Sequence, residues 1–224
     1  MKRLIAAIFA IVAAAAVGAD APAGWQRLKI NDKKKPTHYE AVTDEGRAVV
    51  HARAESSASG LYRKAGFALA EKPIARWSWK VSRLIESADN TKGRYEDSPA
   101  RVIFAFEGDR SKLPAKDQAT LKLAKKLSGQ DLPYATLMYI WSNSAPVGTV
   151  IPNPHTRRIQ MIVASSGAAG VATWQELSRN VAEDFRRAFQ EEPGRLRAYG
   201  FMTDTDNTGE TVEAWYGQIE FVPK

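Results

Sequence analysis

The chain has 224 residues, of which 44% are hydrophobic and 25% charged, and its formal net charge is +7. This composition is that of an ordinary globular protein and excludes a disordered or fibrous chain. The absence of cysteine excludes a disulfide framework, a thiol nucleophile, a cysteine zinc site and a lipidated-cysteine anchor.

The first 19 residues have the features of a secretory signal peptide. Lys2 and Arg3 precede an apolar run at residues 4–17, and small side chains follow it, as at a signal peptidase site. The run is shorter than the roughly 20 residues of a transmembrane helix. We expect cleavage near Ala19, leaving a single domain over residues 20–224 with a net charge of +5 and no transmembrane segment. The sequence therefore predicts export, most simply to a bacterial periplasm.

Alternation of apolar and polar residues, which is typical of half-buried strands, recurs along the rest of the chain. It predicts strands at residues 48–55, 74–84, 101–107, 158–164, 199–203 and 213–222. In the second of these, Trp77 and Trp79 fall on one face, whereas Arg76, Ser78 and Lys80 fall on the other, wet face. The nearly unbroken apolar run at 134–141 predicts a central strand that is covered on both faces.

Two segments have helical spacing instead. One covers about 113–128 and has Pro114 in its first turn, and the other covers about 173–190, where Thr173 and Glu176 would form a capping box. A parallel sheet would need a helix after each strand. The pattern therefore predicts a mainly β fold, an antiparallel β-sandwich or jelly roll with two peripheral helices.

A polar turn at residues 204–209 offers candidate metal ligands. Asp204, Asp206 and Asn207 could present oxygens to a hard cation such as calcium. An EF-hand is excluded, because Trp215 stands at the twelfth position, where a bidentate glutamate belongs. The alternative is a turn whose side chains bond their own backbone. No other cofactor is evident.

Carboxylates near the start of a predicted strand are candidates for catalysis. Asp97 with Asp206 could form the acid pair of a glycosidase, assisted by Arg101 and His155. The alternative is a salt bridge between Arg101 and a neighbouring acid.

Aromatic residues in the predicted strands suggest a surface on which a saccharide could stack. The candidate ligand-binding residues are Trp77, Trp79, Arg101, Tyr139 and Trp141. The alternative is that these rings fill the core, because large aromatic side chains dominate the packing of sandwich folds.

Several motifs together resemble one bacterial family, the domain of unknown function 3047 family. The motifs include Thr37-His38-Tyr39, Trp77-Ser78-Trp79, Asp97-Ser98-Pro99-Ala100-Arg101, Tyr139-Ile140-Trp141 and Asp204-Thr205-Asp206-Asn207-Thr208. The resemblance covers about residues 25–221 and implies an exported bacterial protein without implying an activity. The chain departs from the family pattern where Asn180 and Gln218 each replace an aspartate, so any ligand or ion role of those aspartates is in doubt here.

These observations favour non-catalytic binding of a glycan or envelope polymer. The alternatives are a polysaccharide-cleaving enzyme that uses a carboxylate pair and a structural or partner-binding envelope protein. Nucleic acid is not an expected partner, because no binding motif is present and export would separate the two. The sequence indicates neither the ligand nor the oligomeric state.

Overall fold

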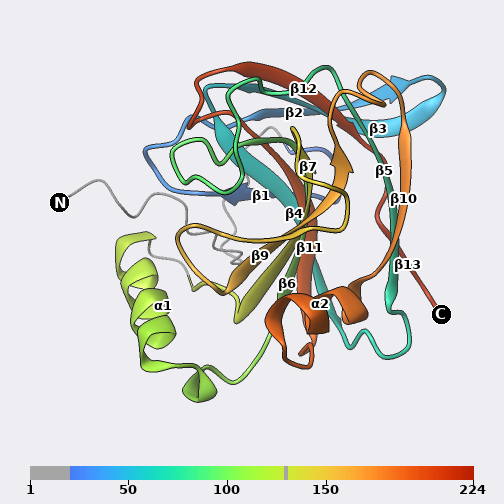
Figure 1. The fold of residues 1–224 in the computed structure, drawn as a ribbon. Coiled ribbons are helices and arrows are strands. Elements are labelled where there is room, and N and C mark those ends of the chain that lie inside the picture. Colours follow the sequence, from blue (N-terminus) through green and yellow to red (C-terminus); the bar gives the residue numbers. More distant parts are fainter. Residues whose placement is uncertain (1–20, 129–130) are drawn as a thin grey trace.

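The computed structural model describes residues 21–128 and 131–224, and in it the chain forms two β-sheets packed face to face (Figure 1). The predicted signal peptide lies outside these residues. The mainly β, sandwich-type fold expected from the sequence is confirmed.

One sheet has seven strands in the order β1-β4-β11-β6-β7-β9-β8. Their bounds are β1 Gln26–Lys29, β4 Ala58–Phe67, β6 Ser98–Phe106, β7 Ala135–Ser142, β8 Val150–Pro152, β9 Ile159–Ser166 and β11 Leu196–Asp204. All neighbours are antiparallel except β7 and β9. This parallel pair is possible because the connection between the two strands is long and contains β8.

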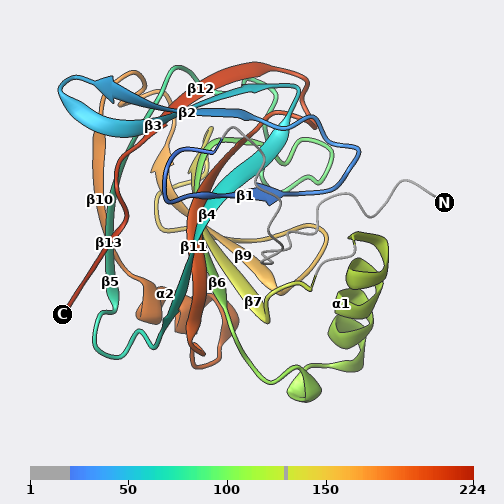
Figure 2. The ribbon, with the colours of Figure 1, turned by 180° about the vertical axis from the view of Figure 1, so that it is seen from behind.

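The other sheet has six strands, with the order β10-β5-β12-β3-β2 and with β13 also paired to β5. Their bounds are β2 His38–Asp44, β3 Arg47–Glu55, β5 Ile74–Val81, β10 Gln175–Asn180, β12 Thr211–Tyr216 and β13 Glu220–Val222. Figure 2 shows β2, β3 and β12 crossing one end of the sandwich. The segment predicted as one strand at 213–222 is thus two strands, β12 and β13, separated at 217–219.

The main core lies between the two sheets and includes the inward residues of both. β7 contributes to it through Leu137, Tyr139 and Trp141, while Met138 and Ile140 join a second buried cluster on the opposite face of the same sheet. The prediction of a central strand covered on both faces is therefore confirmed.

Both predicted helical regions contain a helix, but the second is shorter than expected. Helix α1 covers Ala115–Ser128, after the 3-10 helix Arg110–Lys112. Helix α2 covers only Val181–Phe189 and buries Phe185 against Phe106. Asn180 is its N-cap and accepts a hydrogen bond from the backbone N–H of Glu183 at 3.1 Å.

The capping box expected at Thr173 and Glu176 was wrong, because residues 175–180 form edge strand β10. Leu177 lies opposite Trp77 of β5 on the core side, while Glu176 and Ser178 alternate outward. Pairing along β5 satisfies six residues at once and overrides the local helical spacing.

No helix in the described part of the chain is long and apolar enough to cross a membrane.

Candidate functional site

The aromatic residues expected to form a glycan surface lie in the core instead. Trp77, Trp79, Tyr139 and Trp141 are each at most 3% exposed, and Trp77 and Tyr139 pack with ring centroids 5.0 Å apart. Arg101 is also fully buried. The expected surface of these five residues was therefore wrong, because strand alternation turns the four rings toward the opposite sheet, where their large apolar area is buried.

Arg101 is the centre of a buried ion cluster. Its Nε and Nη2 donate to the two carboxylate oxygens of Asp204 at 2.8 and 3.0 Å, and its Nη1 donates to Glu96 at 2.7 Å. Burial raises the pKa of Asp204 to about 7; Arg101 opposes this shift, whereas the nearby carboxylates of Asp97 and Glu96 increase it. The cluster thus holds more acids than its single guanidinium neutralises.

Asp97 fixes the turn that follows β11. Its carboxylate accepts hydrogen bonds from the backbone and side chain of Asn207, at 3.1 and 2.9 Å, and from those of Thr208, both at 2.8 Å. Asp97 is only 1% exposed. The residue therefore ties the segment before β6 to the turn after β11.

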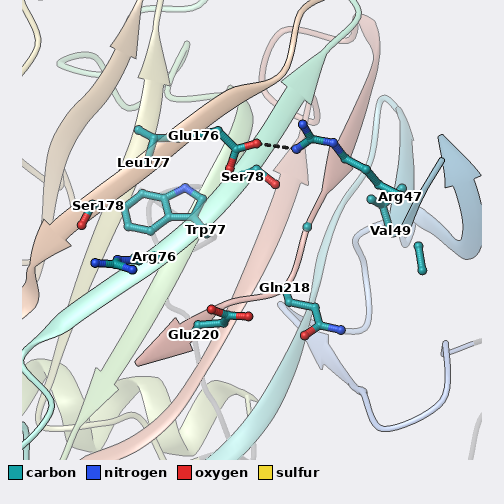
Figure 3. A pocket seen from close by; sticks show the side chains of 12 residues that line it. Arg47, Val49, Arg76, Trp77, Ser78, Glu176, Leu177, Ser178, Gln218 and Glu220 are labelled. Atoms are coloured by element: carbon teal, nitrogen blue, oxygen red, sulfur yellow. Dashed lines mark hydrogen bonds and ion pairs between the residues drawn. The ribbon is translucent and has the colours of Figure 1, made fainter. Parts of the chain in front are cut away.

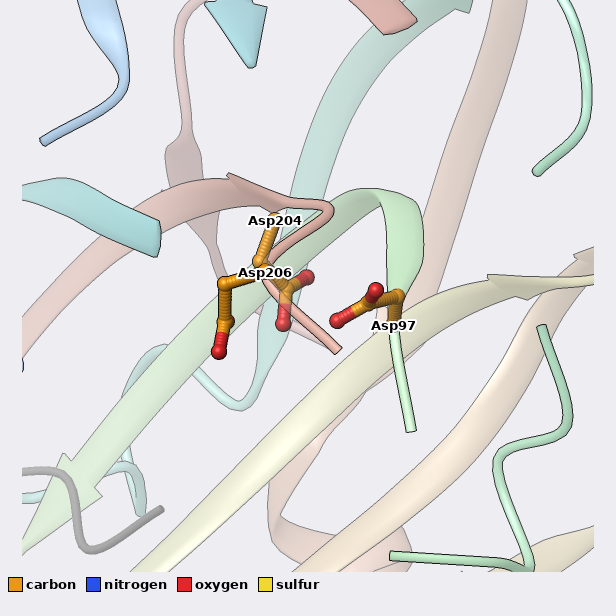
Figure 4. Close-up of side chains that lie close together, drawn as sticks. All are labelled: Asp97, Asp204 and Asp206. Atoms are coloured by element: carbon orange, nitrogen blue, oxygen red, sulfur yellow. The ribbon is translucent and has the colours of Figure 1, made fainter. Parts of the chain in front are cut away.

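Two of the three expected metal ligands, Asp204 and Asp206, come together around this turn, with Asp97 as the third acid. Carboxylate oxygens of Asp97, Asp204 and Asp206 lie within 4.8 Å of one another, and Figure 4 shows the three side chains close together. Each has a protein partner, because Asp206 forms an ion pair with Lys34 while the other two are held as described above. Asn207 donates its amide to Asp97, so its side chain is used in the turn. We propose no metal here.

The candidate catalytic residues are only partly brought together. Asp97 and Asp206 lie close together, as the acid-pair hypothesis required. Arg101, however, forms a buried salt bridge with Asp204 and does not assist that pair. Across the residues that the structure describes, no hydrogen bond or ion pair joins the ring of His155 to this cluster, and that residue lies beside Gly93. The geometry thus gives Asp97 a role in holding the turn.

A pocket of about 580 Å³ opens on the outer face of the six-stranded sheet (Figure 3). Several of its polar side chains make no hydrogen bond or ion pair within the described chain. These free groups are Arg76, Ser78, Ser178, Gln218 and Glu220. Trp77 also lines the pocket, and its indole Nε1 is buried without a hydrogen-bond partner, although a buried donor is normally paired.

The floor of this pocket is a break in the strand ladder. β12 pairs with β5 at residues 79–81 and β13 pairs with it at 74–76, so Trp77 and Ser78 face the irregular segment 217–219. Gly217 donates its N–H to the backbone carbonyl of Ser78 at 2.9 Å. A Cβ on Gly217 would lie 2.3 Å from the Ser78 hydroxyl, so any larger residue here would force that hydroxyl to turn away.

The side wall is built by the hairpin between β2 and β3. Arg47 reaches from β3 to form an ion pair with Glu176 on β10, beside Ser78 in Figure 3. The guanidinium of Arg47 also lies 5.1 Å from the centre of the Trp174 ring, a cation–π distance. Trp174 in turn donates its indole N–H to Asp44 at 2.9 Å, which anchors the hairpin.

Lys80 lies beyond this wall, between two tryptophans. Its ammonium is 5.5 Å from the Trp174 ring and 4.8 Å from the Trp215 ring, and it pairs with Asp44 at 2.5 Å and Glu45 at 3.1 Å. Burial alone lowers the pKa of Lys80, but the hydrogen bonds to the two carboxylates outweigh that effect and raise it. Trp174 and Trp215 are both partly exposed, unlike the four buried rings.

Of the residues that line this pocket, only Trp77 was among the predicted site residues, although the strand pattern pointed to two more. Strand alternation placed Ser78 and Arg76 on the wet face opposite the tryptophans. Gln218 lines the pocket, whereas Asn180 caps α2. Glu176 was not considered as a site residue, because the local sequence pattern assigned it to a helix capping box.

The fold and the pocket define a β-sandwich protein with a candidate ligand site on the outer face of one sheet. The sequence matches the family model described as "Protein of unknown function (DUF3047)" over residues 23–220, and the chain belongs to this family, as its motifs predicted. No curated protein matches the sequence.

Three solved structures illustrate the fold-level similarity. The xyloglucanase domain of NopAA, a type three effector from Sinorhizobium fredii, has a TM-score of 0.45 and 8% identity, covering 91% of this chain and 96% of its own. The endo-1,4-beta-glucanase CelB2 has a TM-score of 0.43 and 10% identity, and the match covers 90% of this chain and 94% of CelB2. The K1 cleaved adhesin domain of Lys-gingipain from Porphyromonas gingivalis W83 has a TM-score of 0.39 and 10% identity, and the match covers 92% of this chain and 94% of the adhesin domain. These TM-scores are too low to indicate the function of this chain.

Proposed function

We propose that the protein binds a glycan, without cleaving it, in the pocket on the outer face of the six-stranded sheet. The observation that carries the proposal is a pair of unpaired polar groups in the pocket lining: the Ser78 hydroxyl makes no hydrogen bond within the described chain, and the indole Nε1 of Trp77, next to it in β5, is buried without a partner. Leaving a buried polar group without a hydrogen bond is costly, so a ligand that supplies the missing partner would bind with a net gain.

The chemistry of the other free groups fits a polyhydroxylated ligand. Each sugar hydroxyl both donates and accepts hydrogen bonds. The pocket offers a pure donor in Arg76, a pure acceptor in Glu220, and mixed groups in Ser178 and Gln218. Val49 supplies an apolar contact of the kind that carbohydrate C–H groups require.

Cleavage has less support than binding. The catalytic candidates Asp97 and Asp206 are engaged by Asn207, Thr208 and Lys34, so their oxygens are committed to the protein itself. A docking surface for a protein partner has less support as well. Among the described residues, the exposed large apolar side chains are Tyr95, Leu123 and Val147, which belong to three separate segments.

Export remains part of the proposal, because the basic and apolar N-terminal residues have the pattern of a signal peptide. N-terminal sequencing of the protein recovered from a periplasmic fraction tests this point. A mature N-terminus near residue 20 is expected, and an intact Met1 in the cytoplasmic fraction would contradict it.

The binding proposal is tested by calorimetric titration of the purified protein with a panel of plant, bacterial and storage oligosaccharides. Gln218→Ala and Ser178→Ala should each weaken binding of any ligand found by roughly 3- to 10-fold, the effect of one lost hydrogen bond. Both side chains are exposed, so these variants should fold normally. Gln26→Ala, an exposed glutamine on β1 of the other sheet, is the matched control and should bind as the unmodified protein does. Absence of binding to every saccharide would refute the proposal.

A further inference from the structure

We infer that the glycan taken by this pocket is uncharged, an inference that rests on the proposed function and narrows its ligand class. The lining includes two arginines and two glutamates, and it has neither lysine nor histidine. The formal charges of the pocket therefore cancel, although the whole chain carries an excess of positive charge.

The charges cancel between neighbouring residues as well as over the pocket as a whole. Arg47 and Glu176 form an ion pair across the pocket, which occupies both charges. Arg76 and Glu220 are cross-strand partners in the pairing of β5 with β13, so they lie side by side on the same face. An acidic sugar brought to the guanidinium of Arg76 would also be brought beside the carboxylate of Glu220, which removes most of the attraction.

The charges bordering the pocket are compensated too. Lys80, the nearest lysine along β5, is held by Asp44 and Glu45. His51 of β3 lies between Glu40 and Glu213, with ring nitrogens 3.1 and 3.4 Å from their carboxylates. Both of these bordering basic side chains therefore already face carboxylates, while the neutral hydrogen-bonding groups of the pocket, Ser78, Ser178 and Gln218, remain free within the described chain.

The first test compares neutral and acidic oligosaccharides of similar length. Calorimetric titrations with cellohexaose, xylohexaose, maltohexaose and chitohexaose are set against titrations with hexagalacturonate, at 0.05 and 0.5 M NaCl. We expect a neutral oligosaccharide to bind, with an affinity that changes less than about twofold between the two salt concentrations, because no net charge is neutralised. Tighter binding of the galacturonate, weakened severalfold by salt, would overturn the inference while leaving the proposed function intact.

The second test changes the pocket charge one unit at a time. Glu220→Gln should raise the ratio of acidic to neutral affinity by about 2- to 5-fold, as expected for one exposed charge pair, and Arg76→Gln should lower that ratio. The double variant Arg76→Gln/Glu220→Gln restores neutrality and should return the ratio to its starting value. If the single variants shift the ratio no more than Gln26→Ala does, the inference fails. If no saccharide of either kind binds the unmodified protein, the proposed function itself fails.

Discussion

Arg101 and Asp204 are joined by two parallel hydrogen bonds, Nε to Oδ1 at 2.8 Å and Nη2 to Oδ2 at 3.0 Å, and neither residue is more than 3% exposed. The pair connects β6 to β11, which are neighbours in the middle of the seven-stranded sheet. It lies beside the turn that Asp97 fixes, so one set of buried charges holds both the strands and the connection after them.

Removing the guanidinium should destabilise the protein strongly. Arg101→Met leaves Glu96 and Asp204 buried without their cation, and breaking a buried ion pair in this way costs about 3–5 kcal/mol. Urea unfolding followed by circular dichroism measures the loss. Arg186→Met, which removes an exposed ion pair with Glu192, is the control and should change the stability little. Comparable losses in the two variants would contradict the structural role of Arg101.

Asp204 should make the stability depend on pH. Because its pKa rises from 3.8 in the unfolded chain to about 7 in the folded state, the folded protein binds an extra proton between these values. The contribution of this group to the free energy of unfolding is therefore fully present below about pH 4, falls as the pH rises, and is lost above about pH 7.

Asp204→Asn removes this titration. The stability of the unmodified protein relative to the variant should decrease from pH 4 to pH 7 and stay level above it. Urea titrations of both proteins across this range provide the measurement. A relative stability that increases with pH would show instead that Arg101 keeps Asp204 ionised in the folded state.

Calcium should leave the turn at 204–209 unchanged. The carboxylate of Asp97 is already taken by neutral donors of the turn, and those of Asp204 and Asp206 face Arg101 and Lys34, which provide positive charge that an ion would otherwise supply. We expect the midpoint of thermal unfolding to be the same in millimolar calcium and in EDTA. An increase of several degrees with calcium would mean that the ion binds the folded state and would return these residues to the role of ligands.

Gly217→Ala should block the pocket with little effect on the fold. The added methyl group would lie 2.3 Å from the Ser78 hydroxyl, which can rotate away at small cost but then no longer faces a ligand in the same way. Saccharide binding should fall by roughly 3- to 10-fold, the effect of one lost hydrogen bond, measured by calorimetry, with only a small change in the unfolding midpoint. Gly66→Ala, whose Cβ would meet no atom within 4 Å, is the matched control. Equal affinities for the two variants would place the ligand elsewhere.

The alternation of side chains along each strand was enough to determine the fold class. The predicted strands at 134–141 and 74–84 correspond to β7 and β5, although β5 ends at Val81. Burial on both faces was correctly expected for β7, whereas on the expected wet face of β5 only Arg76 is exposed, since Ser78 and Lys80 are buried. Five strands were not predicted: β1, β2, β4, β8 and β10. β10 shows the reason, since its pairing with β5 decided between helix and strand for residues whose local spacing favoured a helix.

The family motifs also followed from the sequence, but the arrangement of the sites did not. Asp97 and Asp206 were chosen as acids that could meet, and they do, yet only the tertiary structure shows that Asn207, Thr208 and Lys34 occupy them. The pocket arises where β12 and β13 leave a gap along β5, which brings Gly217 against Ser78. Periodicity reports which face a side chain takes within its own strand. Strand order and register, set by contacts between residues far apart in the chain, decide which side chains share a cavity.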